Sequence, residues 1–322
     1  MQLSETAKGD SAIFGEAVIW AFFPIITILS YAALSPISSL AWSSVFLVLC
    51  FGLIIIVRGK TKEIFIPEVW KYIPLITLFI TLFYYGLYFT GLKYTTAGDA
   101  GIIALMELFF SYLLFNVWMK EHFSARHTFG AVLMILGAVI ILFPKNGLSF
   151  HGGDWFVLAA AACAPAGNFY QQKLRKIISS ETIVFLRSLA AVPIFFLIAI
   201  LLKVNAPFAA VQKSFWFLAA NGILILGLSK YMWMEGIYRI SVTKANALST
   251  VAPLFTLILA YFILHQSPTV WQLTALVPLG DGSGAVLVEV LARLARGPRW
   301  PGAGEAAEVV RRLRARDDGG VR

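Results

Sequence analysis

Long apolar runs without a polar face dominate the pattern of this chain. The stretch from Tyr238 to Leu264 shows the plan: a short basic turn, then small residues, then a continuous apolar run that contains Pro253. A surface helix of a soluble protein would show polar positions at helical spacing, and this run shows no such face. It is about long enough to cross a bilayer. The pattern predicts a membrane-spanning helix.

Ten such segments follow one another along the chain. Because lipid offers no partners to backbone polar groups, only helices and closed barrels span it, and these runs are continuous rather than alternating. The pattern therefore predicts an all-α polytopic membrane protein with ten transmembrane helices and short loops. The segments cover roughly residues 12–33, 37–57, 72–92, 98–119, 127–143, 153–171, 180–202, 215–237, 243–264 and 270–290.

The two halves of the chain share one plan. The stretch from Tyr94 to Met119 repeats the order seen in Tyr238–Leu264, which we interpret as an internal duplication. Each copy holds five spans, an odd number, so the second copy must insert upside down. The prediction is two inverted repeats, residues 1–146 and 147–290. A shift of 145 positions aligns Gly91 with Gly236, Ala100 with Ala245, Phe110 with Phe255 and Leu114 with Leu259.

Composition and charge agree with a membrane protein and set its orientation. The chain is 59% hydrophobic and 13% charged, against roughly 25% charged in soluble domains. The net charge of +9 fits basic cytoplasmic loops better than nucleic-acid binding. With the N-terminus inside, twelve Lys and Arg fall on the cytoplasmic side up to Lys244 and four on the outer side. The positive-inside rule then predicts a cytoplasmic N-terminus, and we expect a multi-pass protein of the inner (cytoplasmic) membrane.

The C-terminal part differs in residue usage. All 13 Lys lie at or before Lys244, whereas 8 of the 13 Arg lie in 281–322. The tenth segment runs into Gly280–Gly284 (GDGSG), which predicts a degenerate tenth helix. The abrupt change favours a frameshift or fusion as the origin of 281–322 and a disordered 291–322. The native alternative is an Arg-rich amphipathic tail on the cytoplasmic face.

Several short motifs resemble the drug/metabolite transporter superfamily, in particular EamA-type ten-helix exporters. They are Gly15-Glu16 with Trp20, Gly153-Asp154, Lys120-Glu121, and the Ala252–Phe255 block. Two positions depart from the family pattern: Gln266 stands where a Glu often ends the ninth span, and Leu108 replaces a proline. The resemblance implies export of an amino acid or related compound.

Ionisable residues inside apolar spans are the first candidates for the chemistry, because they usually face a cavity or a partner. Glu107 and Lys230 lie deep in the fourth and eighth spans. They either line a substrate cavity or form a structural ion pair with each other. Glu16 fits an interfacial position equally well, and Arg187 favours snorkelling to the cytoplasmic surface.

Polar aromatic residues and prolines complete the candidate site. Tyrosines in mid-span need a partner for the hydroxyl and fit a cavity wall better than lipid, and Asn168 carries an amide at the end of the sixth span. Prolines inside spans free backbone carbonyls and are candidate hinges or inert bends. The cavity candidates besides Glu107 and Lys230 are Trp20, Tyr84, Tyr85, Tyr88, Tyr231 and Asn168, and the hinge candidates are Pro24, Pro165 and Pro253.

The motifs of other function classes are missing from the sequence. It has no GxxxxGK[ST] loop for ATP and no His/Cys cluster for a metal, so we expect neither a cofactor nor an enzyme. The prediction is a secondary transporter that moves a small polar or amphipathic metabolite through the lipid bilayer by alternating access. A channel-like uniporter and a non-transporting membrane scaffold are the alternatives. No motif indicates a coupling proton or ion, or an oligomeric state.

Overall fold

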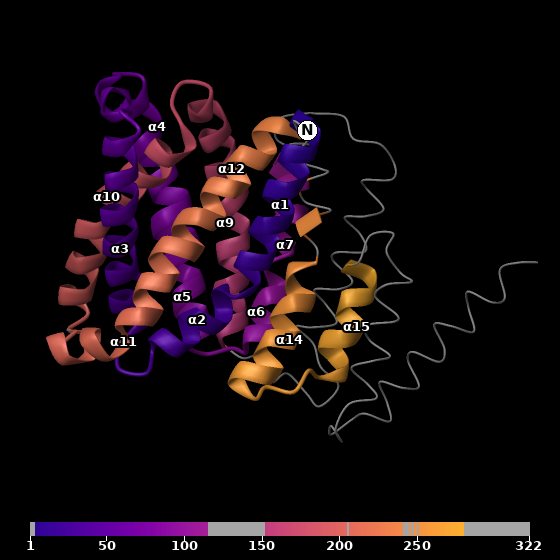
Figure 1. Ribbon diagram of the computed structural model, residues 1–322. Helices are drawn as coiled ribbons and strands as arrows, with labels where there is room; N and C mark the ends of the chain where they lie inside the picture. Colours follow the sequence, from indigo (N-terminus) through magenta and orange to yellow (C-terminus); the bar gives the residue numbers. More distant parts are fainter. Residues whose placement is uncertain are drawn as a thin grey trace, which may run out of the picture.

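The protein is a bundle of helices in the computed structural model (Figure 1). The structure describes residues 4–114, 152–204, 206–240, 245, 248–249 and 251–279, and these ranges contain helices and no strand. The predicted fifth span at 127–143, the GDGSG segment and the 291–322 tail lie outside the described residues.

The helices follow the predicted apolar segments. In chain order they are α1 (Glu5–Ala21), α2 (Phe23–Ser30), α3 (Pro36–Val57), η1 (Thr61–Phe65), α4 (Val69–Ile76), η2 (Thr77–Tyr85), α5 (Gly86–Leu92), α6 (Ala97–Ile103), α7 (Met106–Tyr112), α9 (Gly152–Arg175), α10 (Ser180–Leu201), α11 (Phe208–Ala220), η4 (Asn221–Ser229), α12 (Lys230–Arg239), α14 (Ala252–Leu264) and α15 (Val270–Leu279).

Five helices of the described part are long and apolar enough to cross a membrane. Consecutive elements join to form three of them, and α3 and α10 supply the other two. The all-α membrane class is thereby confirmed for the described residues. The five are Glu5–Ser30, Pro36–Val57, Val69–Leu92, Ser180–Leu201 and Phe208–Arg239.

Helices from the two halves of the chain pack against each other in a regular scheme. α3 lies along α10, and α6 packs on α14. α1 packs on α12, and α5 packs on α9. Each of these four contacts joins the first half to the second, so the bundle has one continuous interior rather than two. In Figure 1, α3 and α10 lie near one edge of this bundle, and α14 and α15 lie near the other.

Glycines permit two of these contacts to be close. A Cβ added at Gly91 on α5 would lie 2.8 Å from the carbonyl oxygen of Gly153 on α9. A Cβ added at Gly9 on α1 would lie 2.7 Å from Cγ2 of Ile240, just beyond α12. The contact at Gly91 requires a residue without a side chain, because an added Cβ would meet backbone atoms.

Several spans are irregular near mid-length. The first is broken at Phe22, between α1 and α2, and the fourth at Ala104–Leu105, between α6 and α7. The third and eighth contain π-helical segments of nine residues, η2 and η4, which begin at Thr77 and Asn221. The predicted fourth segment, 98–119, begins with α6 and α7, which the turn at Ala104–Leu105 separates, and its end beyond residue 114 lies outside the described residues.

Basic side chains gather at the end of the bundle that holds the beginning of α1. The letter N marks this end in Figure 1. Glu235 on α12 binds Arg175 of α9 and Arg239, with N–O distances of 2.8 and 2.6 Å. Arg239 also binds Glu5 at the start of α1 at 3.2 Å. The beginning of α1 therefore lies beside the ends of α9 and α12.

A second group of ion pairs and hydrogen bonds joins the loop after α3 to the beginning of α10. Glu181 binds Arg58 at 3.0 Å and Lys60 at 2.8 Å. Glu63 in η1 accepts hydrogen bonds from the Ser179 backbone N–H at 3.0 Å and from the Thr182 hydroxyl at 2.6 Å. The carboxylates of Glu63 and Glu181 both lie at the first turn of α10, where the helix dipole favours negative charge.

Candidate functional site

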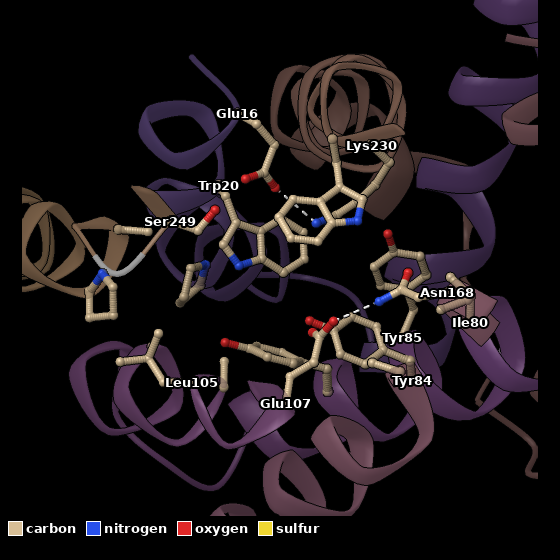
Figure 2. Close-up of a pocket in the computed structure, with 18 of the residues that line it drawn as sticks. Glu16, Trp20, Ile80, Tyr84, Tyr85, Leu105, Glu107, Asn168, Lys230 and Ser249 are labelled. Carbon is tan, nitrogen blue, oxygen red and sulfur yellow. Dashed lines mark hydrogen bonds and ion pairs between the residues drawn. The ribbon is translucent and has the colours of Figure 1, made fainter. Parts of the chain in front are cut away.

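A cavity of about 100 Å³ lies between helices of the two halves. One water molecule needs about 10–15 Å³ of such cavity volume, so this cavity has room for several water molecules. Residues of α1, α2, η2, α5, α6, α7, α9, α10, α12 and α14 line it. Figure 2 shows part of this lining, with aromatic, acidic and basic side chains directed toward one space. The polar and aromatic lining comprises Glu16, Trp20, Tyr84, Tyr85, Tyr88, Glu107, Asn168, Gln171, Arg187, Lys230, Trp233, Ser249 and Thr256.

Lys230 lines the cavity directly after the π-helical segment η4. Its Nζ lies 3.0 Å from a carboxylate oxygen of Glu16 and 3.3 Å from the centroid of the Trp20 ring (Figure 2). The Ser229 hydroxyl donates to the same Glu16 oxygen at 3.1 Å. The carboxylate neutralises the ammonium group, and the ring face adds a cation–π attraction. This arrangement ties α12 to α1 at the cavity wall.

Glu107 lies across the cavity from Lys230 in Figure 2, on the first turn of α7. Its Oε1 accepts a hydrogen bond of 2.7 Å from the Asn168 amide of α9. The Asn168 carbonyl oxygen accepts in turn from Gln171 at 2.9 Å. The predicted structural alternative, a direct Glu107–Lys230 pair, was therefore wrong for the contacts that the structure describes. The lysine binds Glu16, and the glutamate binds an amide.

An aromatic wall joins these two charged groups. The Trp20 ring stacks with the Tyr84 ring at 6.4 Å and meets the Tyr88 ring edge-on at the same distance. Tyr85 packs edge-on against Tyr84 at 5.1 Å. The Tyr88 hydroxyl donates to the backbone carbonyl of Ala100 at 3.0 Å. Trp20, Tyr84, Tyr85 and Tyr88 all line the cavity.

Tyr231, predicted as a cavity residue, does not line this cavity. Its side chain interacts with Arg58 at the end of α3 instead. On α12 it comes one position after Lys230, so the roughly 100° turn per residue directs it to another face of the helix. The expectation for Tyr231 was wrong because it rested on depth in the span and not on helical phase.

The three predicted hinge prolines have different positions in the helices. Pro24 and Pro253 occupy the second positions of α2 and α14, directly after irregular backbone, and both line the cavity. Pro165 lies inside the continuous helix α9 and is absent from the cavity lining. Pro24 and Pro253 therefore lie at helix starts on the cavity wall, and Pro165 does not.

Two charged residues are buried more deeply than the sequence predicted. Glu16 is 2% exposed and Arg187 is 1% exposed, and both line the cavity. The snorkelling interpretation of Arg187 was therefore wrong, and the Glu16 side chain faces the cavity. The sequence signal for these two cavity residues was a charged side chain inside an apolar span. Ser249, Thr256 and Trp233 are further lining residues that sequence reasoning missed, because their types are common in membrane helices.

The comparison with known families decides the identity of the chain. The family model of the EamA-like transporter family matches it twice, over residues 7–143 and 151–283. The protein belongs to the EamA-like transporter family. Membership assigns this membrane protein to transport and not to enzymatic catalysis.

Two proteins named as transporters are similar to the chain at low identity. The chain is 24% identical over 195 residues to an uncharacterized transporter of Synechocystis sp., a match that covers 57% of this chain and 56% of that protein. It is 29% identical over 191 residues to the aromatic amino acid exporter YddG of Ancylobacter novellus, covering 58% and 65%. Each match thus spans less than two thirds of the relative's length. A solved structure titled "Crystal structure of protein" shares the fold with a TM-score of 0.65 and 23% identity, over 90% of this chain and 99% of that chain.

Proposed function

We propose that this EamA protein is a secondary transporter that moves an amino acid or related small metabolite through its central cavity by alternating access, in the direction of export. The observation that carries the proposal is the cavity itself: charged side chains and tyrosines converge between the two halves of a family transporter. Buried ionisable groups in membrane helices mark substrate pathways, because burial without a function is costly. The similarity to an aromatic amino acid exporter supports the substrate class.

Inverted repeats are the second part of the proposal. The helix contacts support them, because α1 on α12 pairs the first span with the eighth, and α5 on α9 pairs the third with the sixth. The sixth span is the counterpart of the first, and the eighth is the counterpart of the third. Exchanging the two halves therefore converts one of these helix pairs into the other. The π segments η2 and η4 occur at corresponding places, 144 positions apart. In inverted repeats the substrate binds at the interface near the bilayer midplane, which is where this cavity would lie.

The ends of corresponding helices support the same arrangement. The end of the bundle rich in Arg and Lys holds the beginning of α1 but the end of α9, which are the first spans of the two halves. It also holds the end of α3 but the beginning of α10. We propose that this end faces the cytoplasm of the inner membrane, in accordance with the positive-inside rule.

A route for export begins at the same basic end. A second hollow of about 340 Å³ is lined by Gln171, Arg175, Lys176 and Tyr238. Gln171 also lines the central cavity, so the two hollows share one wall residue. We propose that substrate enters here when the ion pairs of Glu235 with Arg175 and Arg239 separate.

Counterflow in proteoliposomes tests the proposed function. Vesicles that hold the purified protein are loaded with unlabelled amino acid and diluted into trace labelled amino acid, with L-tryptophan, L-phenylalanine, L-leucine, L-threonine and L-lysine as the panel. A carrier accumulates the label transiently, because each inward step requires the return of a loaded site. We expect counterflow with at least one member, and a roughly tenfold or greater loss in Glu107→Gln, since this change removes a charge from the cavity.

The alternatives predict different results. A channel-like uniporter gives flux that grows linearly with concentration and no counterflow. A scaffold gives no flux with any member of the panel. The control variant Glu68→Gln removes an exposed carboxylate outside the cavity and should leave counterflow unchanged. Equal loss in both variants would show that the Glu107 effect is not specific to the cavity.

A further inference from the structure

Arg187 is a buried cation without an acidic partner among the described residues. It lies on α10 with 1% of its surface exposed, and it lines the central cavity. Its Nη2 donates a hydrogen bond to the backbone carbonyl of Leu226 in η4, at a long 3.4 Å. Within the described part of the chain, its Nε and Nη1 have no hydrogen-bond partner. Three of the five guanidinium N–H groups are therefore unsatisfied.

The other charges of the cavity do not satisfy this guanidinium. Glu16 binds Lys230 and Ser229. Glu107 binds Asn168. In contrast, Arg175 and Arg239 at the basic end each bind a carboxylate of Glu235 at 2.8 and 2.6 Å. Arg187 thus differs from the paired arginines of the same bundle, and a buried cation left in this state is unfavourable unless something else binds it.

Tyr85 supplies a second unused donor at the same place. The guanidinium carbon lies 5.6 Å from the centroid of the Tyr85 ring, which holds the arginine by a cation–π contact. The Tyr85 hydroxyl is buried and has no partner within the described residues. A planar guanidinium and a neighbouring phenol are donors that match a carboxylate, which accepts two parallel hydrogen bonds from arginine.

We propose that Arg187 and Tyr85 form the carboxylate subsite of the cavity and select substrates that carry a carboxylate group. This inference rests on the proposed transport function and names its substrate chemistry. The carboxylate of an α-amino acid binds Arg187. Its ammonium group faces the Glu107 carboxylate, and its side chain packs on Trp20 and Tyr84. An amine that lacks the carboxylate leaves the guanidinium unsatisfied and binds weakly.

Thermal stabilisation of the purified protein in detergent tests the subsite without requiring transport. The probes are the panel amino acids, together with phenethylamine, which lacks the carboxylate of phenylalanine, and 3-phenylpropanoate, which lacks the ammonium. We expect stabilisation of the wild type by at least one panel amino acid and by 3-phenylpropanoate, and none by phenethylamine. In Arg187→Gln the affinity for the bound amino acid should fall roughly tenfold or more. Arg187→Lys should keep part of it, because a lysine has the charge without the planar fork.

The stability of the ligand-free variants separates a binding role from a structural one. Removing an unpaired buried charge should leave the melting temperature of ligand-free Arg187→Gln equal to or above that of the wild type. The matched control Arg58→Gln breaks an ion pair with Glu181 and lines neither hollow, so it should lower the melting temperature slightly and keep the ligand-induced shift. The reverse pattern, with a destabilised Arg187→Gln that retains amino-acid affinity, would overturn the proposal.

The results also distinguish this inference from the proposed function. Counterflow in the wild type with unchanged affinity in Arg187→Gln would refute the subsite and leave transport standing. Carboxylate-dependent stabilisation that is lost in Arg187→Gln, without counterflow, would refute transport and leave the subsite standing. The subsite would be refuted if phenethylamine stabilised the protein as much as phenylalanine does. It would also be refuted if none of the carboxylate-bearing probes stabilised the protein.

Discussion

At the residue scale, burial and bonding partners explain the roles of the charged side chains better than their positions along the predicted spans. Lys230 is stable inside a membrane span because Glu16 and the Trp20 ring both contact it. Glu235 is stable near the basic end because Arg175, Arg239 and the Ser180 hydroxyl bind it. Arg187 lacks such partners in the described part of the chain, and for that reason we propose that it binds the substrate carboxylate.

Glu63 provides a residue-scale prediction about pH. Burial opposes its ionisation, but hydrogen bonds from Thr182 and Ser179 outweigh this effect and hold the pKa of Glu63 below its ordinary value. A carboxylate with a lowered folded-state pKa stabilises the fold above the unfolded pKa of about 4.3, and the contribution is lost as pH falls through the folded value. Glu63→Gln should therefore melt below the wild type at pH 7, and the difference should shrink below about pH 4.

The comparison of variants isolates this effect from other titrating groups. Melting temperatures in detergent at several pH values give the measurement, and Glu68→Gln, an exposed carboxylate of the same loop region, is the control. A melting-temperature difference for Glu63→Gln that stays constant down to pH 3 would mean that the ionised carboxylate does not hold the start of α10.

At the element scale, glycines set how closely helices of the two halves approach. An alanine at Gly91 would place its Cβ 2.8 Å from the Gly153 carbonyl oxygen, and backbone atoms cannot move aside cheaply. Gly91→Ala should destabilise the protein by about 1–3 kcal/mol, as other overpacked contacts do. Gly86, five positions earlier, is the matched control, because nothing lies within 4 Å of its added Cβ.

Gly86→Ala should leave stability unchanged or raise it by up to about 1 kcal/mol, because alanine favours helix over glycine. Unfolding in detergent, followed by tryptophan fluorescence, gives both free energies of unfolding. Equal effects of the two substitutions would mean that α5 and α9 do not depend on close approach at Gly91.

Much of the element pattern could be predicted from the sequence, because apolar runs report helices directly. The expected spans at 37–57, 72–92 and 180–202 correspond closely to α3, α4–α5 and α10. The break at Ala104 and the segments η2 and η4 could not be predicted. A local apolar sequence such as Thr77–Tyr85 is compatible with α- and π-helix alike.

The candidate site was predictable by residue type but not by pairing. Tyrosines and charges in apolar spans indicate a cavity, and most of those named do line one. The partner of Lys230 is Glu16, which lies more than 200 positions away in the sequence, so no local spacing predicts that contact. The position of Tyr231 around its helix directs its side chain away from the cavity. Burial among neighbouring helices replaced the snorkelling interpretation of Arg187 with a place on the cavity wall.

At the scale of the whole molecule, the described helices surround the central cavity, with a basic end on one side and, on the other, an end held by hydrogen bonds of amide side chains. At that opposite end the Gln272 amide donates to Asp99 at 3.0 Å, and the Ala97 N–H donates to the Gln266 side chain at 3.2 Å. Ion pairs close the basic end, between Glu235, Arg175 and Arg239. Alternating access requires these two sets of contacts to open in turn.

Thiol accessibility of the cavity is the most direct test of this account. In a variant with Cys50 and Cys163 replaced by alanine, Ala104→Cys places a thiol at the break between α6 and α7, on the cavity wall. Lys93→Cys and Lys173→Cys report the outer and cytoplasmic sides. A membrane-impermeant thiol reagent is added to cells and, separately, to inside-out vesicles, with and without the transported amino acid.

We predict that Lys93→Cys reacts only in cells and that Lys173→Cys reacts only in inside-out vesicles. Ala104→Cys should react in both preparations, and the amino acid should slow each reaction, because the same cavity opens to either side and holds the substrate. Reaction of Ala104→Cys in neither preparation, or equal rates with and without the amino acid, would contradict the claim that this cavity is the transport pathway.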